Sequence, residues 1–589
     1  MDKADQLILE QLDKEVPHER TCRVCGGKWQ IELADIEFCK TLLIPIPRVC
    51  PMCSLLQKAA FRNERSLYRR KSDVTGEEII AVISPDKKYK VYDKDYWYSD
   101  NWDSLDYGFE YDPARNIFDQ VNDLVERVPY QSLFSVNNEN SEYINHAKDN
   151  KNCYLISQAV GNENCYFGRF VLRCQDCIDN LQVVDSQLCY ENYNGKNNYN
   201  CIYLYSSENC RDSHFSENLT GCKNCCLCFN LNNKQYCWDN KQLSKEEYEK
   251  KMITWNFEKQ KNDFFNKRKN RVTQSLTMRN CENCLGDGLS NSKNAINCFN
   301  SEKLDNCRYV YECPDQKDSY YEYSTGLGAT DNYNCNGSGG SHKLISCFGC
   351  IGSRESYYSF ICINSEHLFG CVGLRNKKYC ILNRQYSQKE YQQLIEKIKL
   401  SMLSSGEYGE YLSPQISPFG YNETLASEYR PLIKEEALKL GFKWSDYDPE
   451  SNNNGPFYET LPIKEYFDEN KTKELLAGVL KCEVTGKPFK IMGPELAFYL
   501  KHNIPIPKRS PNQRHKDRMA LKNPYKLWHR QCMCEGQLTI NNEQLTGGMG
   551  ASIKADAPMN LKLLTHRSGR KMFIVRLAIR RAFYKFQTL

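Results

Sequence analysis

The chain has 589 residues, a net formal charge of +5 and 31 cysteines. That length allows several domains, and the cysteine content is far above that of an ordinary cytosolic enzyme. The N-terminus lacks the basic end and apolar run of a secretory signal, and no stretch approaches eighteen uncharged apolar residues, which argues against a membrane span. We therefore expect a cytoplasmic protein whose cysteines are metal ligands or buried thiols rather than disulfides.

Two CxxC pairs follow an expected N-terminal helix at 1–21 and are separated by twenty-four residues. This spacing, within residues 22–74, is typical of a zinc ribbon or treble clef. Four thiolates satisfy tetrahedral Zn²⁺ completely, so the site is expected to be structural, with no open position for a reacting water. A redox dithiol or an iron cluster is the alternative. The predicted zinc ligands are Cys22, Cys25, Cys50 and Cys53.

A twelve-residue repeat at 150–243 follows an acidic, aromatic segment at 75–149. Written in rows of twelve from Asn150, one column holds cysteine in seven of eight rows and Ser213 in the other. Asn or Asp often precedes the cysteine and an aromatic residue or Ile often follows it, which predicts short strands between polar turns. A fixed period indicates stacked units, so we predict a β-solenoid in which one or two rows form a coil and the cysteines stack inside. The predicted core thiols are Cys153, Cys165, Cys177, Cys189, Cys201, Cys225 and Cys237.

The repeated thiols have three candidate roles. Free cysteine is a small, frequently buried residue, so packing in a narrow core is the first. Binding a soft metal or reacting reversibly with oxidants is the second, especially at the CxxC pairs Cys174/Cys177 and Cys222/Cys225. Disulfide formation is the third.

Each of two cysteine arrays ends in a helix start signal. Ser244 and Glu247 form a capping box that predicts a helix over 244–272, and Ser387 and Glu390 repeat it for a helix at 387–403. Between them lies a second, less regular array at 281–386, in which GDG (286–288) and NGSGGS (336–341) are expected as insertion loops. The helices are expected to cover the open solenoid ends.

The C-terminal part contains a second copy of the first module. After a connecting segment at 404–481, residues 482–534 align without gaps with residues 22–74, with the sequence IPIP on IPIP. The four ligand positions become Cys482, Thr485, Ser510 and Gln513, so the copy is expected to be degenerate. Zinc could instead be recruited by Cys482, Cys532 and Cys534.

A basic stretch follows IPIP in both copies. Lys and Arg interleaved with aromatic residues suit a phosphate backbone with occasional base stacking, which favours RNA or a ribonucleoprotein as partner. A solvated face, or docking of the acidic segment onto these charges, is the alternative. The predicted phosphate contacts are Arg62, Arg65, Arg69, Arg70, Arg514, Lys516, Arg518 and Arg530.

The motif CxxCGxxW, followed by IPxPxxCPxC and a basic stretch, resembles the probable zinc-ribbon family. The NCY rows, SPFGYNET (417–424) and GFKWSDY (441–447) make residues 15–534 similar to uncharacterised multi-cysteine zinc-ribbon proteins of candidate-phyla bacteria. The resemblance implies zinc binding and a bacterial cytoplasmic origin, with no established activity. It also implies that Ser72 stands where relatives tend to have another cysteine. The basic tail at 535–589 departs from the pattern.

No enzyme motif occurs in the required context. The sequence therefore predicts a multidomain, mainly β protein: a zinc ribbon, two cysteine-rich β-solenoid arrays each capped by a helix, and a degenerate ribbon copy. We expect a non-enzymatic zinc-binding scaffold, with RNA or a ribonucleoprotein as first partner and a protein assembly as second. Soft-metal storage or thiol redox chemistry by the stacked cysteines is the alternative.

Overall fold

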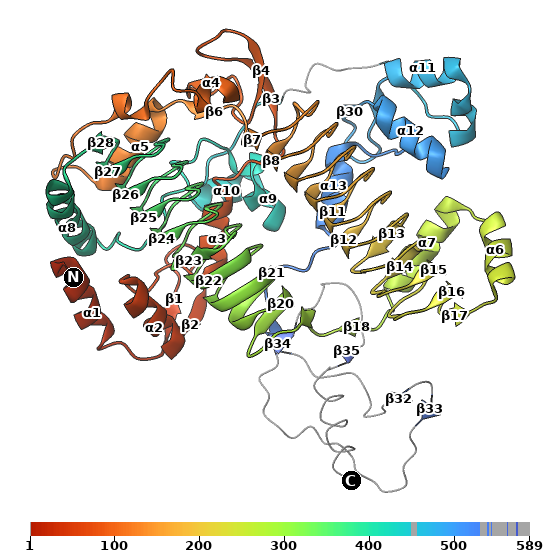
Figure 1. The fold of residues 1–589 in the computed structure, drawn as a ribbon, viewed down its shortest axis with the longest axis horizontal. Coiled ribbons are helices and arrows are strands. Elements are labelled where there is room, and N and C mark those ends of the chain that lie inside the picture. The colour runs from red at the N-terminus through yellow and green to blue at the C-terminus, as the bar shows by residue number, and fades with distance from the viewer. Residues whose placement is uncertain are drawn as a thin grey trace, which may run out of the picture. The chain divides into compact units, whose positions relative to one another are not determined.

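The computed structural model describes residues 2–448 and 456–529, together with four short strand segments in the tail. The predicted mainly β architecture with a solenoid is confirmed (Figure 1). The chain divides into two compact units, each with its own solenoid. Unit 1 consists of Met1–Ser135 with Met278–Pro449, and unit 2 of Val136–Thr277 with Glu450–Leu589. No helix in the described part of the chain is both long and apolar enough to cross a lipid bilayer.

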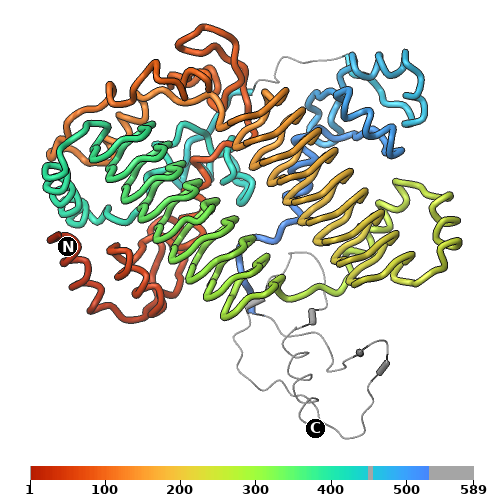
Figure 2. The backbone as a smooth tube through the Cα atoms, in the orientation of Figure 1, coloured from red at the N-terminus to blue at the C-terminus, as the bar shows by residue number. Residues whose placement is uncertain are grey.

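The first array forms the solenoid of unit 2, whose stacked turns are visible in Figure 2. Arg169 pairs in parallel with Ser157 on one side and with Leu181 on the other, twelve residues away in each direction. One row of the repeat is therefore one turn of the solenoid. The strands are β7 (Ser135–Val136), β8 (Asn145–Lys148), β9 (Ser157–Val160), β10 (Arg169–Leu172), β11 (Leu181–Val184), β12 (Tyr193–Lys196), β13 (Ile202–Tyr205), β14 (His214–Glu217), β15 (Lys223–Cys226), β16 (Gln235–Trp238) and β17 (Lys241–Gln242). The stack thus begins before residue 150.

Each turn is built from four steps of three residues. Parallel bridges recur at every third residue, as at Glu163↔Gln175, Tyr166↔Ile178 and Arg169↔Leu181. The residue that follows each of these positions has a positive φ, for example 52° at Asn164. Asn, Asp and Gly adopt this left-handed region most readily, which explains why Asn or Asp so often precedes the repeated cysteine.

Away from the end turns of the stack, the residue after each left-handed position is buried inside the coil. The seven predicted core thiols are confirmed as interior residues, because each is at most 2% exposed. The Cys165 thiol donates to the carbonyl of Glu163 at 3.4 Å and faces that of Cys174 on the next turn at 3.5 Å. Asn162 bridges successive turns in the same way, donating to Val171 O at 2.8 Å and accepting from Cys174 N at 2.9 Å. The narrow interior exposes backbone polar groups, so small side chains that hydrogen-bond fill it.

The second array forms the solenoid of unit 1. Its turns also take twelve residues, except one of eleven (Leu285↔Ile296) and one of thirteen (Gln316↔Ala329), which explains the irregular cysteine spacing. The expected insertion loops are wrong: Asp287 of GDG lies on a strand, and Asn336 of NGSGGS bridges Phe348 on the next turn. The strands are β19 (Met278–Arg279), β20 (Leu285–Ser290), β21 (Lys293–Arg308), β22 (Pro314–Tyr320), β23 (Ala329–Thr330), β24 (His342–Ile345), β25 (Arg354–Tyr357), β26 (Glu366–Phe369), β27 (Lys378–Ile381) and β28 (Arg384–Gln385).

Both predicted capping boxes are present. Ser244 opens α6 (Lys245–Ile253), and Ser387 opens α8 (Gln388–Ser405). The first helix is shorter than predicted, because Asn256 accepts from Lys259 N at 2.9 Å and starts a separate helix, α7 (Phe257–Arg268). The two capping helices pack against the last long strand of their solenoid, β16 and β27 respectively.

The remaining elements surround the solenoid of their own unit. The predicted N-terminal helix ends early, since α1 spans Lys3–Leu12 and a strand starts at His18. The part of the acidic segment that belongs to unit 1, residues 75–135, docks on the unit 1 solenoid, where Lys377 pairs with Asp103 at 2.6 Å. Its last residues, from 136 to 149, enter the unit 2 solenoid. The other helices are α2 (Leu33–Leu42), α3 (Pro51–Ala59), α4 (Lys94–Tyr98), α5 (Ile117–Arg127), α9 (Leu425–Tyr429) and α10 (Lys434–Lys439) in unit 1, and α11 (Glu469–Ala477), α12 (Gly493–His502) and α13 (Pro511–Met519) in unit 2.

Candidate metal centre

The four predicted metal ligands come together at one corner of unit 1. Strands β1 (His18–Thr21) and β2 (Lys28–Ile31) form a hairpin whose turn carries Cys22 and Cys25. Gly26 takes a φ of +67° and donates its N–H to Cys22 O at 2.9 Å, which closes this turn. Cys50 is the N-cap of α3, and Cys53 lies in the first turn of that helix. We call the hairpin and helix the first cysteine module.

The sulfur atoms have the spacing that a metal ion requires. All four lie within 4.8 Å of one another, and the Sγ atoms of Cys25 and Cys50 are 3.9 Å apart. Tetrahedral zinc with Zn–S bonds of about 2.3 Å places its sulfur ligands about 3.8 Å apart. The set could therefore hold a tetrahedral metal ion with no position left open. Within residues 2–448 and 456–529, this is the one group of three or more potential ligands that meets the spacing.

Backbone hydrogen bonds reach two of the sulfur atoms, and the pKa values of the thiols differ from one another. Gly27 N donates to Cys25 Sγ at 3.4 Å, and Cys50 N donates to Cys22 Sγ at 3.3 Å. Hydrogen bonding to Cys53 lowers the pKa of the Cys50 thiol to about 5, and the same contact raises the pKa of Cys53. Burial also raises the pKa of the Cys25 thiol, so a metal ion that binds all four sulfur atoms would have to displace thiol protons from the cluster.

The C-terminal copy keeps the backbone of the module but only one of its four thiols, Cys482. Cys482, Thr485 and Ser510 occupy the positions of Cys22, Cys25 and Cys50, and Ser510 is again a helix N-cap, here of α13. The turn is closed by the same bonds, Cys482 N to Lys487 O and Gly486 N to Cys482 O, both at 2.9 Å. Burial opposes ionisation of Cys482, but hydrogen bonds from Thr485 and nearby backbone amides outweigh it and lower its pKa to about 7. The alternative ligands Cys532 and Cys534 lie outside the described residues.

A further copy of the module, missed by the sequence analysis, lies at residues 68–98. Strands β3 (Tyr68–Lys71) and β4 (Glu78–Ala81) form its hairpin, and Ser72, Thr75 and Asp93 take the positions of Cys22, Cys25 and Cys50. Ser72 Oγ donates to Asp93 Oδ2 at 3.1 Å. In this copy a hydrogen bond therefore joins hairpin and helix at the positions that carry the sulfur cluster in the first copy.

One further contact identifies the three segments as the same fold. The residue after the first ligand position donates its N–H to a carbonyl two residues before the helix N-cap: Arg23 to Arg48, Asp73 to Val91 and Glu483 to Lys508, at 3.1, 2.9 and 3.0 Å. The sequence signal was the shared Val-Thr-Gly at 74–76 and 484–486.

Arg514 and Arg518, predicted to bind phosphate, are instead buried in unit 2. Arg514 lies 3.2 Å from Asp179 and 3.0 Å from Glu495, and Arg518 lies 2.9 Å from both Asp179 and Glu191. Both guanidinium groups form buried ion pairs with these carboxylates, so the assignment of Arg514 and Arg518 as phosphate contacts is wrong. Basic residues at helical spacing usually mark an exposed face, but in α13 the buried carboxylates of the solenoid allow these two arginines to lie on the packed face.

The other predicted phosphate contacts differ in exposure. Arg62 is buried and paired with Glu64, so this assignment is also wrong, and Arg70 pairs with Asp73 at 2.9 Å. Arg65 is partly buried, whereas Arg69 and Lys516 are exposed. Arg530 lies outside the described residues.

The first cysteine module and its C-terminal copy each contact the solenoid of their own unit through equivalent helix positions. In unit 1, Lys58 of α3 donates to Asn334 at 2.7 Å, and Asp35 of α2 accepts from Arg308 at 2.9 Å. The ungapped alignment places Lys58 on Arg518 and Asp35 on Glu495, the residues of the ion cluster in unit 2. The sequence aligned these positions but gave no sign that they pack on a solenoid.

Comparisons with known proteins add no functional argument. No protein-family model matches the sequence, and no curated protein is significantly similar to it. Among solved structures, the chain is matched to a protein described as a "putative acetyltransferase" from Desulfovibrio desulfuricans G20. That match has 10% sequence identity and a TM-score of 0.11, and covers 44% of this chain and 69% of the other. A TM-score this low supports no conclusion on fold or activity.

Proposed function

We propose that the chain is a zinc-binding, non-enzymatic scaffold protein whose first cysteine module is a zinc ribbon. The observation that carries the proposal is the set of four sulfur atoms within 4.8 Å of one another at a hairpin turn and a helix N-terminus. Zinc is favoured because four thiolates in a tetrahedral, closed arrangement suit it. Such an ion stabilises the module and leaves no coordination position for catalysis.

The interior thiols support a scaffold rather than a metal store or redox protein. Each of the seven repeat cysteines is buried, and burial raises the pKa of thiols such as Cys189 and Cys371. Burial likewise raises the pKa of Cys298 to about 12. Metal binding and thiol oxidation both require the thiolate, so the thiols whose pKa is raised stay protonated and serve packing and hydrogen bonding. Cys153 differs, because a hydrogen bond with Cys165 lowers its pKa.

A protein assembly is the partner class that we favour. The hypothesis of RNA binding depended on eight basic residues, of which Arg62, Arg514 and Arg518 are occupied by internal ion pairs. Arg69 of unit 1 and Lys516 of unit 2 are exposed and remain as candidates, Arg65 and Arg70 are partly buried, and the loss of three cations reduces the electrostatic attraction on which RNA binding depends.

Metal analysis with thiol counting on protein purified without oxygen tests the proposal. We expect one zinc ion per chain, lost when Cys22 and Cys53 are both replaced by Ser. The matched control is Cys39→Ser, because Cys39 is a buried cysteine on α2 outside the cluster, and it should keep the zinc. Absence of zinc, or many equivalents of a soft metal, would contradict the proposal.

A further inference from the structure

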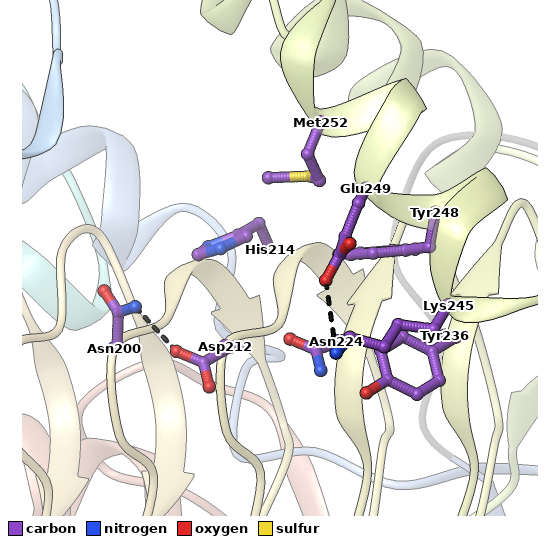
Figure 3. A pocket seen from close by; sticks show the side chains of 9 residues that line it. All are labelled: Asn200, Asp212, His214, Asn224, Tyr236, Lys245, Tyr248, Glu249 and Met252. Carbon is purple, nitrogen blue, oxygen red and sulfur yellow. Dashed lines mark hydrogen bonds and ion pairs between the residues drawn. The ribbon is translucent and has the colours of Figure 1, made fainter.

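A cavity of about 380 Å³ lies in unit 2 between the solenoid wall and α6 (Figure 3). The wall contributes Asn200, Asp212, Asn224 and Tyr236, which stand at the same position of four successive turns. The first two are linked, since Asn200 Nδ2 donates to Asp212 Oδ1 at 2.7 Å. The volume falls in the lower part of the range for small-molecule sites, about 300–1,000 Å³.

Two buried polar side chains that line the cavity have an atom without a hydrogen-bond partner. His214 is 8% exposed and its Nδ1 is unpaired, and Tyr248 of α6 is 4% exposed and its hydroxyl is unpaired. Figure 3 shows Tyr248 extending from the helix toward His214 across the space between helix and wall. Buried polar atoms are nearly always paired, so the unpaired His214 Nδ1 leaves this corner of the unit incomplete as it stands. The Tyr248 hydroxyl does not distinguish the two units, because the equivalent Tyr391 hydroxyl in unit 1 is unpaired as well. A ligand with hydroxyl groups can both donate to and accept from such atoms.

The charges of the cavity are balanced. Asp212 Oδ2 lies 3.4 Å from Arg211 Nε, and Glu249 Oε1 lies 3.8 Å from Lys245 Nζ. Burial lowers the pKa of His214 to about 4, so its imidazole is neutral at pH 7. A site without net charge has no electrostatic preference for an ion, and its carboxylates, amides and phenol suit a neutral molecule rich in hydroxyl groups.

The corresponding corner of unit 1 shows why the cavity exists. Tyr391 follows Ser387 by four residues, as Tyr248 follows Ser244, and the two tyrosines are 143 residues apart (391 − 248). In unit 1, the His367 ring stacks on Tyr379 with centroids 4.8 Å apart, and both rings pack against Tyr391. The residue 143 positions before His367 is Asn224, whose shorter side chain leaves this space unfilled.

We propose that this cavity binds a neutral, polyhydroxylated small molecule of the size of a monosaccharide or disaccharide. The ring of Tyr236 offers an apolar face against which a sugar ring can stack. The carboxylates of Asp212 and Glu249 accept hydrogen bonds from its hydroxyl groups. His214 and Tyr248 gain the partners that they lack, through small movements of their rings.

Saturation-transfer NMR on the full-length chain tests this proposal with defined probes. The neutral probes are glucose, galactose, N-acetylglucosamine and cellobiose, and the charged probes are choline and inorganic phosphate. We expect saturation transfer to at least one neutral saccharide and to neither charged probe. Asn224→His, which rebuilds the filled corner of unit 1, should abolish the signal. His367 has a φ of 55° and Asn224 one of 52°, so the backbone already accommodates histidine at this position.

A second pair of variants does not depend on how well the histidine is accommodated. Tyr248→Phe removes one unpaired hydroxyl and should weaken saccharide binding at least fivefold. Tyr391→Phe removes the equivalent hydroxyl of α8, which is also buried without a partner, and should leave binding unchanged. Lack of transfer to all four saccharides, transfer to a charged probe alone, or equal binding by the Tyr248→Phe and Tyr391→Phe variants would overturn the proposal.

Discussion

Arg518 and Glu191 form a buried ion pair in unit 2, with Nη1 2.9 Å from Oε1 and the arginine side chain 1% exposed. The pair joins α13 of the C-terminal module to the solenoid, and Asp179 extends it at 2.9 Å from the same guanidinium. Without Arg518, Glu191 would lose its cationic partner and Asp179 would keep only Arg514, so Arg518 holds the module and the solenoid of this unit together.

Arg518→Ala should therefore destabilise the protein, by about 3–5 kcal/mol, because removing one partner leaves uncompensated buried charge. Chemical denaturation of the full chain, followed by circular dichroism, measures the loss. Lys516→Ala is the control: this neighbouring cation is exposed, and its removal should change stability by less than about 0.5 kcal/mol. Equal effects of the two substitutions would show that Arg518 is solvated in solution.

The sequence was sufficient to predict the solenoid but not its finer period. The cysteine column from Cys153 to Cys237 is visible because one residue type recurs. The three-residue step was missed because its marker is a backbone conformation, which Asn164, Phe167 and Arg173 all share despite unrelated side chains. Side-chain identity records such a step only where Asn, Asp or Gly happens to occupy it.

Metal ligands were predictable from spacing, whereas docking was not. Cys22 and Cys53 belong to a local pattern that a linear sequence displays in full. The module at 68–98 escaped notice because its thiols are gone and its loop is shorter: Asp93 follows Ser72 by 21 residues, whereas Cys50 follows Cys22 by 28. The contact of Asp35 with Arg308 joins residues 273 apart, and no local pattern encodes it.

The C-terminal module should regain a metal site when its ligands are restored. Because the backbone hydrogen bonds of the first module recur here, Thr485→Cys, Ser510→Cys and Gln513→Cys together with native Cys482 should place four thiols in tetrahedral reach. We expect the zinc content to rise from one to two ions per chain in metal analysis. A triple substitution to Ala at the same positions is the control and should leave one. An unchanged content in the cysteine variant would mean that the helix start does not approach the hairpin closely enough.

Thiol labelling should separate the metal ligands from the core cysteines. Among the described cysteines, Cys25 is exposed, Cys50, Cys281 and Cys284 are intermediate, and the rest are buried. Folded, metal-free protein should therefore label rapidly at these four positions, as located by peptide mass spectrometry. Zinc should protect Cys25 and Cys50 and leave Cys281 and Cys284 reactive. Rapid labelling of repeat cysteines such as Cys189 would contradict the interior placement of the thiols.

The stability lost on substituting a cysteine of the repeat column should depend on the size of the new side chain rather than on the loss of the thiol. Ser213 already occupies the column and donates to Arg211 O at 3.0 Å, as the cysteines do to their own turn. Cys189→Ser should therefore cost less than about 1.5 kcal/mol, the scale of one hydrogen bond. Cys189→Phe overfills the narrow interior and should cost clearly more than Cys189→Ser, about 3 kcal/mol. Thermal denaturation distinguishes the two, and similar losses would indicate a role for the sulfur itself.

Acid should destabilise unit 2 through His214. Burial lowers the folded-state pKa of His214 to about 4, below the unfolded value of about 6.5, so the unfolded chain binds more protons between these values. The stabilising contribution is therefore complete above pH 6.5 and is lost as pH falls toward 4, by up to about 3 kcal/mol.

His214→Phe keeps a buried ring that cannot titrate, and should flatten the dependence of melting temperature on pH between 6.5 and 4. His367→Phe in unit 1 is the control, because His367 is less buried and pairs with Glu355 at 3.4 Å. If His214→Phe retains the full acid sensitivity of the native chain, then His214 is accessible to solvent and its imidazole is not held neutral by burial.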